Sequence, residues 1–413
     1  MIDFYRYKLS NGLTVIIHKD ISTPLVTTNM LYKVGSKNED PEQTGFAHLF
    51  EHLMFGGSAN VPDFDTPIQD AGGDNNAFTN SDITNFYNIL PCENLEVALW
   101  LESDRMLQLD INQKGLNVQK KIVLEEFNET SINQPYGDLW HVLSDTAYTT
   151  HPYKWPTIGK IPAHIENAKL KDVSSFFNKH YKPNNAILVV AGNIEINPTK
   201  DLVEKWFKDI GPGDIENKLL ANEPIQKVFR TKVLRRDVPA DAIYFAFHMG
   251  ERLNKDFPAF DILSDVFSGG RSARFYQRLL KGTTIFSHID AYITGSVDPG
   301  FFIIEAKLIG ENNIDEARAL IWAELEQLKV EKVESEELQK IKNSLISSIS
   351  YSEVSINHKA MNLAFYEMLG DANLINKQEE EYINVTAEDI QRISKDTFIR
   401  SNCTEIVYVR NAD

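Results

Sequence analysis

The first half of the chain alternates between the two-residue period of strands and the longer period of helices. It opens with two short strand patterns around Asn11-Gly12, a pair typical of tight hairpin turns. The strand patterns lie within residues 5–18 and at 25–34, 76–80, 83–90 and 186–192. The helical patterns lie at 44–55, 93–109, 114–130 and 172–180. Because 186–192 is apolar throughout and ends in glycine, we expect it to be a central strand.

The second half repeats this order after residues 210–226, a stretch without periodicity that concentrates glycine and proline and is predicted to be a linker. Its strand patterns are 228–233, 242–248, 285–294, 300–308 and 405–409. Its helical patterns are 257–267, 272–279, 314–329, 335–349, 357–369 and 387–398. The sequence therefore predicts an α+β protein of two related domains, residues 1–215 and 216–413, each a sheet backed by helices.

Composition narrows the classes of function. The 413 residues are 42% hydrophobic and 24% charged, as in ordinary folded proteins, and 59 acidic against 42 basic residues give a net charge of −17. Such a charge repels nucleic acids and anionic lipid surfaces, so neither is an expected partner. Cys92 and Cys403 are too few and too distant for a disulfide framework. Without a leader pattern or an apolar run of about 18 residues, the expected location is cytoplasmic, or periplasmic if a leader has been removed.

Candidate chemistry is concentrated in the first predicted helix, which contains His48-Leu49-Phe50-Glu51-His52. Residues four apart project from the same face of a helix, so both imidazoles can hold one cation while Glu51 lies close beside them. The alternative is a charged helix face without a metal. A structural zinc site uses four protein ligands, often cysteines, whereas a catalytic one combines His, His and a carboxylate with an open position. With no cysteine nearby, the pattern favours catalysis.

A third ligand must come from another element, and the helical pattern 114–130 offers Glu126. We expect Val118, Ile122 and Val123 to mark the buried face of this helix and Glu126 to share it. A carboxylate in such a position needs a metal or an ion-pair partner, and a buried ion pair remains the alternative. Glu129, on the same predicted face, is the second candidate ligand.

These residues carry a resemblance to a known family. His-x-x-Glu-His with a glutamate 74 positions further on resembles the inverted-motif zinc peptidases, the insulinase, pitrilysin and mitochondrial-processing-peptidase family. Further matching segments are Asn11–Val15, Gly45–Phe55, Gly72-Gly73 with Asn76-Ala77, His151–Tyr153, Tyr181–Pro183, Val189–Gly192 and Gly269–Phe275. The length resembles the short, dimeric members. This implies mainly antiparallel sheets in two domains that form half of a clamshell chamber.

The resemblance assigns Zn²⁺ to His48, His52 and Glu126 and makes Glu51 the general base that activates a zinc-bound water. It also implies that substrate binds as an extra strand along the segment from Gly73 to Thr79, with Gly73, Asn76 and Ala77 as substrate-binding residues. From the residues alone, Asn75-Asn76 fits a plain turn equally well.

Two positions depart from the family pattern. Family members have a second glutamate seven residues before the ligand, where this chain has Gln119, which could orient Glu126 through a hydrogen bond without adding charge. They also have an arginine and a tyrosine in the second domain that reach the substrate carbonyl, and an ungapped alignment places Leu279 and Phe286 there. His288 is a candidate substitute donor.

The sequence thus predicts a zinc endopeptidase subunit that acts on peptides or unfolded segments. It is expected to dimerise, as a homodimer or with a paralogue that supplies the arginine and tyrosine. The alternative is a non-catalytic structural subunit, like the respiratory core proteins that resemble this family. Because those relatives lose zinc residues, the intact His48, Glu51, His52 and Glu126 favour the enzyme.

Overall fold

The computed structural model describes residues 1–58, 60–215, 220–310 and 313–411, and the chain forms two compact units. Unit 1 contains residues 1–128, 155–220 and 350–377, and unit 2 contains residues 129–154, 221–349 and 378–413. Both are α+β, which confirms the predicted fold class. Each unit is assembled from discontinuous segments, so the linear boundary at 215/216 stays a prediction. Part of the predicted linker, residues 216–219, lies outside the described residues.

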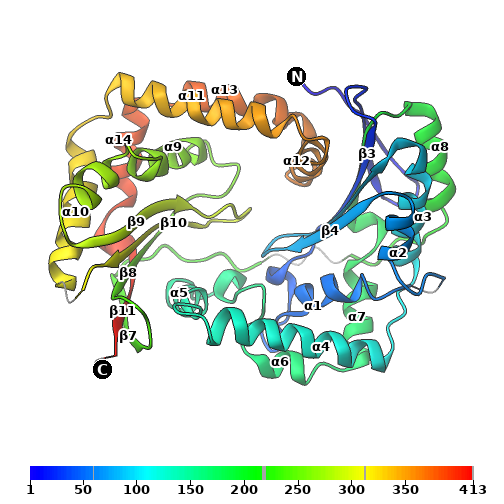
Figure 1. Cartoon of the computed structure of the whole chain (residues 1–413), viewed down its shortest axis with the longest axis horizontal. Coiled ribbons are helices and arrows are strands. Elements are labelled where there is room, and N and C mark those ends of the chain that lie inside the picture. Colours follow the sequence, from blue (N-terminus) through cyan, green and yellow to red (C-terminus); the bar gives the residue numbers. More distant parts are fainter. Residues whose placement is uncertain (59, 216–219, 311–312, 412–413) are drawn as a thin grey trace. The chain divides into compact units, whose positions relative to one another are not determined.

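Unit 1 is built on a sheet that is labelled at β3 and β4 in Figure 1. This sheet has six strands in the order β1-β2-β6-β3-β5-β4. Its strands are β1 (Tyr5–Lys8), β2 (Thr14–Lys19), β3 (Leu25–Tyr32), β4 (Asp74–Thr79), β5 (Thr84–Pro91) and β6 (Ala186–Gly192). Its helices are α1 (Phe46–Leu53), α2 (Asp65–Asp70), α3 (Leu95–Leu107), α4 (Gln113–Phe127), α6 (Pro162–Glu166), α7 (Leu170–His180), α8 (Ile196–Phe207) and α12 (Ile356–Met368). Only β2 and β6 pair in parallel.

Unit 2 repeats this topology with the order β7-β11-β8-β10-β9 and one parallel pair, β7 with β11. Its strands are β7 (Arg230–Arg236), β8 (Ala242–His248), β9 (Phe286–Ile293), β10 (Phe301–Leu308) and β11 (Cys403–Arg410). Its helices are α5 (Leu139–Ala147), α9 (Phe257–Ser268), α10 (Ile314–Val330), nearly all of α11 (Ser335–Ser352), α13 (Gln378–Asn384) and α14 (Ala387–Thr397). The predicted repetition of one order in both halves is therefore confirmed.

Each sheet is covered on one face by a helix from the other half of the sequence. The helix α12 contacts β3 and β6 in unit 1, and α5 contacts β11 and β7 in unit 2. In β6, Leu188 and Val190 enter the core under the helices of the first half, whereas Ile187 and Val189 pack with α12. Side chains of successive strand residues point to opposite faces, so a strand covered on both faces is apolar throughout. This explains the unbroken apolar run predicted to be central.

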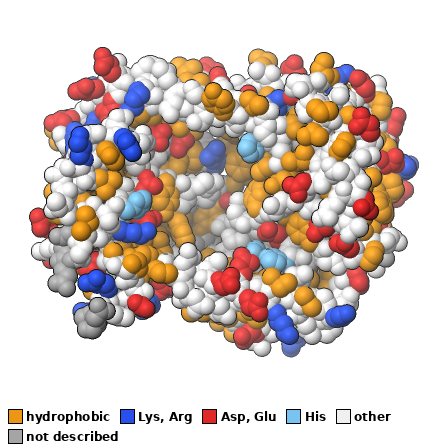
Figure 2. Space-filling view, in the orientation of Figure 1, with side chains coloured by type: hydrophobic (Ala, Val, Ile, Leu, Met, Phe, Trp, Pro, Cys, Tyr) orange, Lys and Arg blue, Asp and Glu red, His pale blue; other side chains and the backbone are white. Residues whose placement is uncertain are grey.

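Charged side chains are present on the surface of both units, although some, such as Glu102 and Arg105, are buried. Figure 2 shows acidic side chains spread over the visible face and mixed with basic ones, as expected from the negative net charge. Among the described residues, no helix combines the length and the apolarity needed to cross a bilayer.

Candidate metal centre

The helix α1 carries the two predicted histidine ligands. Ala47, Leu49 and Phe50 are buried on its other faces and fix the helix against the core. His48 and His52 therefore share the remaining face, with ring centroids 4.8 Å apart and ring planes 84° apart. The amphipathic pattern of this short helix is thus what aims both imidazoles in one direction.

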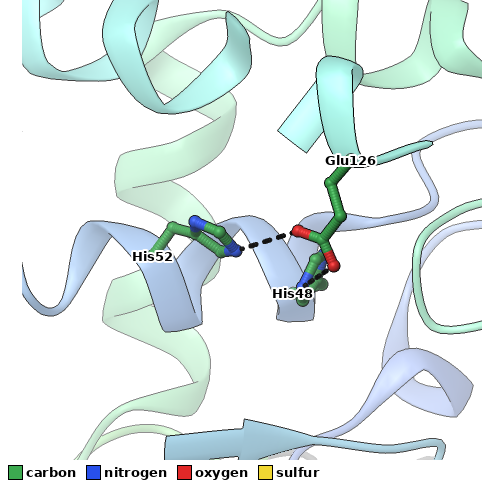
Figure 3. Close-up of side chains that lie close together, drawn as sticks. All are labelled: His48, His52 and Glu126. Carbon is green, nitrogen blue, oxygen red and sulfur yellow. Dashed lines mark ion pairs between the residues drawn. The ribbon is translucent and has the colours of Figure 1, made fainter. Parts of the chain in front are cut away.

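The third group comes from α4, which packs against α1. Glu126 Oε1 lies 3.6 Å from His48 Nε2, and Glu126 Oε2 lies 3.5 Å from His52 Nε2 (Figure 3). One potential ligand atom from each of these three residues lies within 4.8 Å of the others. Within the described part of the chain, they form the cluster of histidine, cysteine or acidic side chains that could hold a metal ion. The structure therefore brings together the three residues that the sequence analysis proposed as ligands.

The spacing of these atoms fits a metal ion. Zinc ligands lie about 2.0–2.2 Å from the ion, and in a tetrahedron this puts neighbouring ligand atoms about 3.4 Å apart. The two nitrogen–oxygen distances of 3.6 and 3.5 Å, each to a different oxygen of Glu126, are close to this edge length, and one atom from each of the three residues lies within 4.8 Å of the others. The Glu126 side chain is 40% exposed and that of His52 is 23% exposed, so one side of the cluster is open to solvent. Two imidazoles, one carboxylate and an open side form the donor set of a catalytic rather than a structural zinc site.

The protonation states also suit a cation. Burial lowers the pKa of His48 to about 4, against the opposing effect of Glu126. The hydrogen bond from His52 lowers the pKa of Glu126, which keeps that group a carboxylate. Metal binding requires neutral imidazole and ionised carboxylate, so both groups are ready at neutral pH.

Glu51 lies on the same helix but outside the three-residue cluster. Burial raises its pKa, and Thr79 of β4 and the ring of His52 act in the opposite direction. A carboxyl group with a raised pKa beside a metal cluster has the property expected of a general base, because proton transfer is most effective when the pKa approaches the working pH.

The segment predicted to bind substrate forms the edge of the sheet. β4 is the last strand in the order, pairs with β5 and contacts α1. Gly73 immediately precedes β4, and a side chain there would meet the carbonyl oxygen of Ile89 at 2.9 Å. Asn76 and Ala77 are neighbours in the strand and therefore face opposite sides of the sheet. The plain turn considered for Asn75-Asn76 is wrong, but substrate binding by Gly73, Asn76 and Ala77 stays a prediction.

The reasoning that selected Glu126 needs correction. Val118 and Ile122, expected on the buried face of α4, are 47% and 42% exposed, whereas Val123 is fully buried. Glu126 thus lies at the border of the buried face, where it can reach the histidines. Glu129 is exposed, beyond the end of α4, and outside the cluster of three found among the described residues. Gln119 is half-buried two turns before Glu126, and its supporting role stays a prediction.

The two aligned positions in unit 2 lie in the core. Leu279, in the short helical segment Phe275–Leu280, and Phe286, the first residue of β9, are both almost fully buried. A side chain that contacts substrate must be exposed. Arg278 and His288, the exposed polar neighbours of these positions, are therefore better placed to contact a substrate. Arg278 donates to Glu324 at 2.9 Å, and His288 Nε2 lies 3.9 Å from Glu305.

Glu39, which supports the start of α1, was not among the residues predicted from the sequence. It is buried in the preceding loop, and its carboxyl oxygens accept hydrogen bonds from the start of the helix. The sequence feature that could have indicated this role is an acidic residue a few positions before a helix whose cap residue, Gly45, has no side chain to cap it.

Fold and cluster together define a class: a protein of two similar α+β units, one of which presents an open His, His and Glu cluster beside an edge strand. Comparison with known families identifies this class. Residues 14–160 match the family described as insulinase (peptidase family M16), and residues 167–345 match the one described as peptidase M16 inactive domain. The chain belongs to the insulinase (M16) peptidase family.

Relatives with known names support this assignment. The zinc protease PqqE of Helicobacter pylori is 29% identical, over 96% of this chain and 91% of that protein. A probable mitochondrial-processing peptidase subunit beta of Arabidopsis thaliana is 24% identical over 83% of this chain and 66% of that protein. The crystal structure of a protease from Helicobacter pylori is 27% identical, covers 99% of this chain and 100% of its own, and superposes with a TM-score of 0.93. An M16 inactive domain from Pseudomonas fluorescens, at 16% identity and a TM-score of 0.88 over 100% of this chain and 98% of its own, shares the fold.

Proposed function

We propose that this chain is the zinc-binding subunit of an endopeptidase that hydrolyses peptides or unfolded segments. The observation that carries the proposal is the cluster of His48, His52 and Glu126, whose ligand atoms lie within 4.8 Å and leave one side open. The names of the relatives as zinc proteases support zinc as the metal.

The residues divide the chemistry among them. His48, His52 and Glu126 would hold zinc, which when bound supplies the Lewis acid that polarises the scissile carbonyl and lowers the pKa of a water molecule. Glu51 accepts the proton of the attacking water on its carboxylate and then donates it to the leaving amine. The edge strand β4, beside α1, offers its main-chain groups to an extended peptide, which gives affinity with little demand on sequence.

Metal analysis combined with one substitution tests this function. The purified chain should bind one zinc per molecule, and Glu51→Gln should retain the zinc while losing nearly all hydrolysis of a fluorogenic unstructured peptide. The ligands remain in this variant, so retained zinc with lost turnover separates the base from the metal. Turnover of Glu51→Gln within a few-fold of wild type would exclude Glu51 as the base, and absence of zinc from the wild type would exclude the proposal.

We further propose that a partner completes the enzyme. A missing transition-state donor can reduce a rate about 10²–10³-fold, and Leu279 and Phe286 provide no donor at the aligned positions. The isolated chain is then weakly active, and a paralogue with an arginine and a tyrosine at these positions raises its turnover. The assay adds such a paralogue at increasing concentration. High turnover per zinc that the paralogue leaves unchanged would contradict this, and zinc binding without turnover in any combination would favour the non-catalytic alternative.

A further inference from the structure

The helix that carries the histidines begins without a cap of its own. Its first flanking residue, Gly45, has no side chain and adopts φ 89°, a left-handed conformation suited to glycine. A Cβ atom there would meet the carbonyl oxygen of Ile158 at 2.9 Å. The N–H groups of a first helical turn have no partners within the helix, and a side chain at the cap position usually accepts from them. In α1 that acceptor must come from elsewhere in the chain.

Glu39 supplies it from six residues upstream. Its Oε2 accepts from the Gly45 N–H at 2.9 Å, and its Oε1 accepts from the Ala47 N–H at 2.8 Å. The residue is 7% exposed, so these bonds are shielded from water. Burial raises the pKa of Glu39 to about 8, against the opposing effect of the Ala47 and Gly45 N–H groups, so its contribution rests on these hydrogen bonds rather than on charge. Both oxygens are thus engaged at the start of the one helix that carries two predicted ligands and the predicted base.

The start of α1 is tied to the neighbouring segment as well. Thr44 Oγ1 accepts from the Lys160 N–H at 2.7 Å and lies 2.8 Å from His164 Nδ1 in α6. The Lys120 ammonium of α4 donates to the carbonyl oxygens of Glu166 and Ala168 at 2.5 and 3.1 Å. The segment around α6 therefore connects the start of α1 with α4, the helix that supplies Glu126. Glu39 is the side chain in this connection that accepts hydrogen bonds from the backbone at the start of α1.

We propose that Glu39 is a positioning residue for the metal centre, one that sets the place of α1 so that His48 and His52 meet Glu126 at ligand spacing. This inference rests on the proposed zinc function. Ala47 immediately precedes His48, and α1 has only eight residues, so a displaced first turn would move both imidazoles together. Metal ligands must be held within about 0.5 Å of their working geometry, and loss of a supporting group costs about 10–100-fold in affinity.

Unit 2 offers a matched control. Glu223 also accepts from backbone N–H groups, those of Thr149, Thr150 and His151, at 2.8, 2.9 and 3.0 Å. Glu223→Gln therefore removes the same kind of interaction in the unit without the cluster. A general loss of stability would appear in both variants, whereas an effect through α1 would appear only in the Glu39 variant.

The experiment uses the full chain with zinc alone as the probe. The zinc dissociation constant is measured by competition with a chelator, the visible spectrum is recorded after cobalt substitution, and thermal unfolding is recorded for the same samples. Glu39→Gln is expected to weaken zinc binding about 10–100-fold and to change the cobalt spectrum, with Glu223→Gln within about two-fold of wild type. If Glu39→Gln does not fold, Glu39→Asp, which keeps the carboxyl group on a shorter side chain, is expected to weaken zinc binding to a smaller extent.

The outcomes are distinguishable. Unchanged zinc affinity and cobalt spectrum in the folded Glu39 variant would overturn the positioning role and leave the proposed function intact. Equal losses of affinity in the Glu39 and Glu223 variants would also overturn it, since they would reflect global stability. A wild-type chain that takes up no zinc would overturn the proposed function, and this inference with it.

Discussion

The two units share a strand order but place different ionisable side chains on corresponding helices. In unit 1, the helix after β3 carries His48 and His52 four residues apart, and Glu126 reaches them from α4. In unit 2, the helix after β8 is α9, which carries Asp261 and Asp265, also four residues apart. Their cationic neighbour is Lys340 of α11, whose charge acts to lower the pKa of Asp265.

The same strand order therefore supports different side-chain interactions in the two units. Asp261 accepts a hydrogen bond from the hydroxyl group of Tyr382 at 2.6 Å, so a protein donor occupies this carboxylate. In unit 1, one potential ligand atom from each of three side chains lies within 4.8 Å of the others. Thus α1 and α4 bring ligand-type side chains together in unit 1, whereas in unit 2 a carboxylate of α9 accepts from a hydroxyl group of α13.

The largest expected effect is on metal binding in unit 1. Glu126→Gln replaces the carboxylate ligand with a neutral amide and should weaken zinc binding by more than about 100-fold, because only two ligands remain. The measurement is zinc retained after dialysis against a chelator. Lys340→Gln in unit 2 and Glu129→Gln just beyond α4 are the controls and should retain zinc. Loss of zinc in Glu129→Gln with full occupancy in Glu126→Gln would move the ligand by one turn.

The second prediction concerns α12 and α5, the helices that each cover a sheet from the other half of the sequence. Leu363 of α12 and Leu143 of α5 are both fully buried, each against the sheet of the unit it joins. Leu363→Ala and Leu143→Ala should each lower the free energy of unfolding by about 2–5 kcal/mol, because a cavity remains in the core. Urea unfolding followed by hydrogen exchange should locate the loss for Leu363→Ala in unit 1 and for Leu143→Ala in unit 2. A loss in the opposite unit would contradict the assignment of these helices.

A smaller effect is expected at Asp265. Burial raises its pKa to about 6, helped by Asp261 and Asp290 and opposed by Lys340. The folded pKa lies above the unfolded one, so stability falls as the pH rises from about 4 to about 6. Asp265→Asn removes this dependence and should raise the free energy of unfolding at pH 7 by about 1.5 kcal/mol after allowance for solvent screening. Unfolding curves at pH 4 and pH 7 provide the check, and a variant less stable than wild type at pH 7 would contradict it.

The smallest effect has the opposite sign. Burial raises the pKa of Glu223, but the N–H groups of Thr150, His151 and Thr149 outweigh it and lower the pKa to about 2. The folded pKa lies below the unfolded one, so the stabilisation is present above about pH 4.5 and is lost as the pH falls to about 2. Glu223→Gln should cost about 1 kcal/mol at pH 7 after allowance for screening, with the difference disappearing at low pH. A difference that does not depend on pH would show that the carboxylate charge contributes nothing.

Local patterns predicted those features that depend on local spacing. The i, i+4 positions of His48 and His52 determine their common face wherever the helix lies, so both could be placed from the sequence. Glu126 does lie beside the two histidines, but it was selected for a reason that the structure contradicts, since exposed Val118 and Ile122 make the apolar stripe of α4 a poor guide to burial. The periodicity at 357–369 indicated a helix but could not show that it packs on the first sheet, because such pairing depends on contacts distant in sequence. Glu39 was missed although it lies only six and eight residues from the N–H groups that it caps, because periodicity does not show which loop side chain folds back on a helix.

The packing of α12, which lies late in the sequence, on the first sheet also has a consequence for folding during translation. The face of the first sheet that includes Ile16, Leu31, Ile187 and Val189 is covered by α12. About 185 residues separate the end of β6 from the end of the segment that contains α12. Translation at roughly 5–20 residues per second takes about 10–40 s to add them, and during this time α12 cannot cover the apolar face. During that interval the nascent first sheet is a natural client for a chaperone that binds apolar strands, and faster completion of the chain would shorten its exposure.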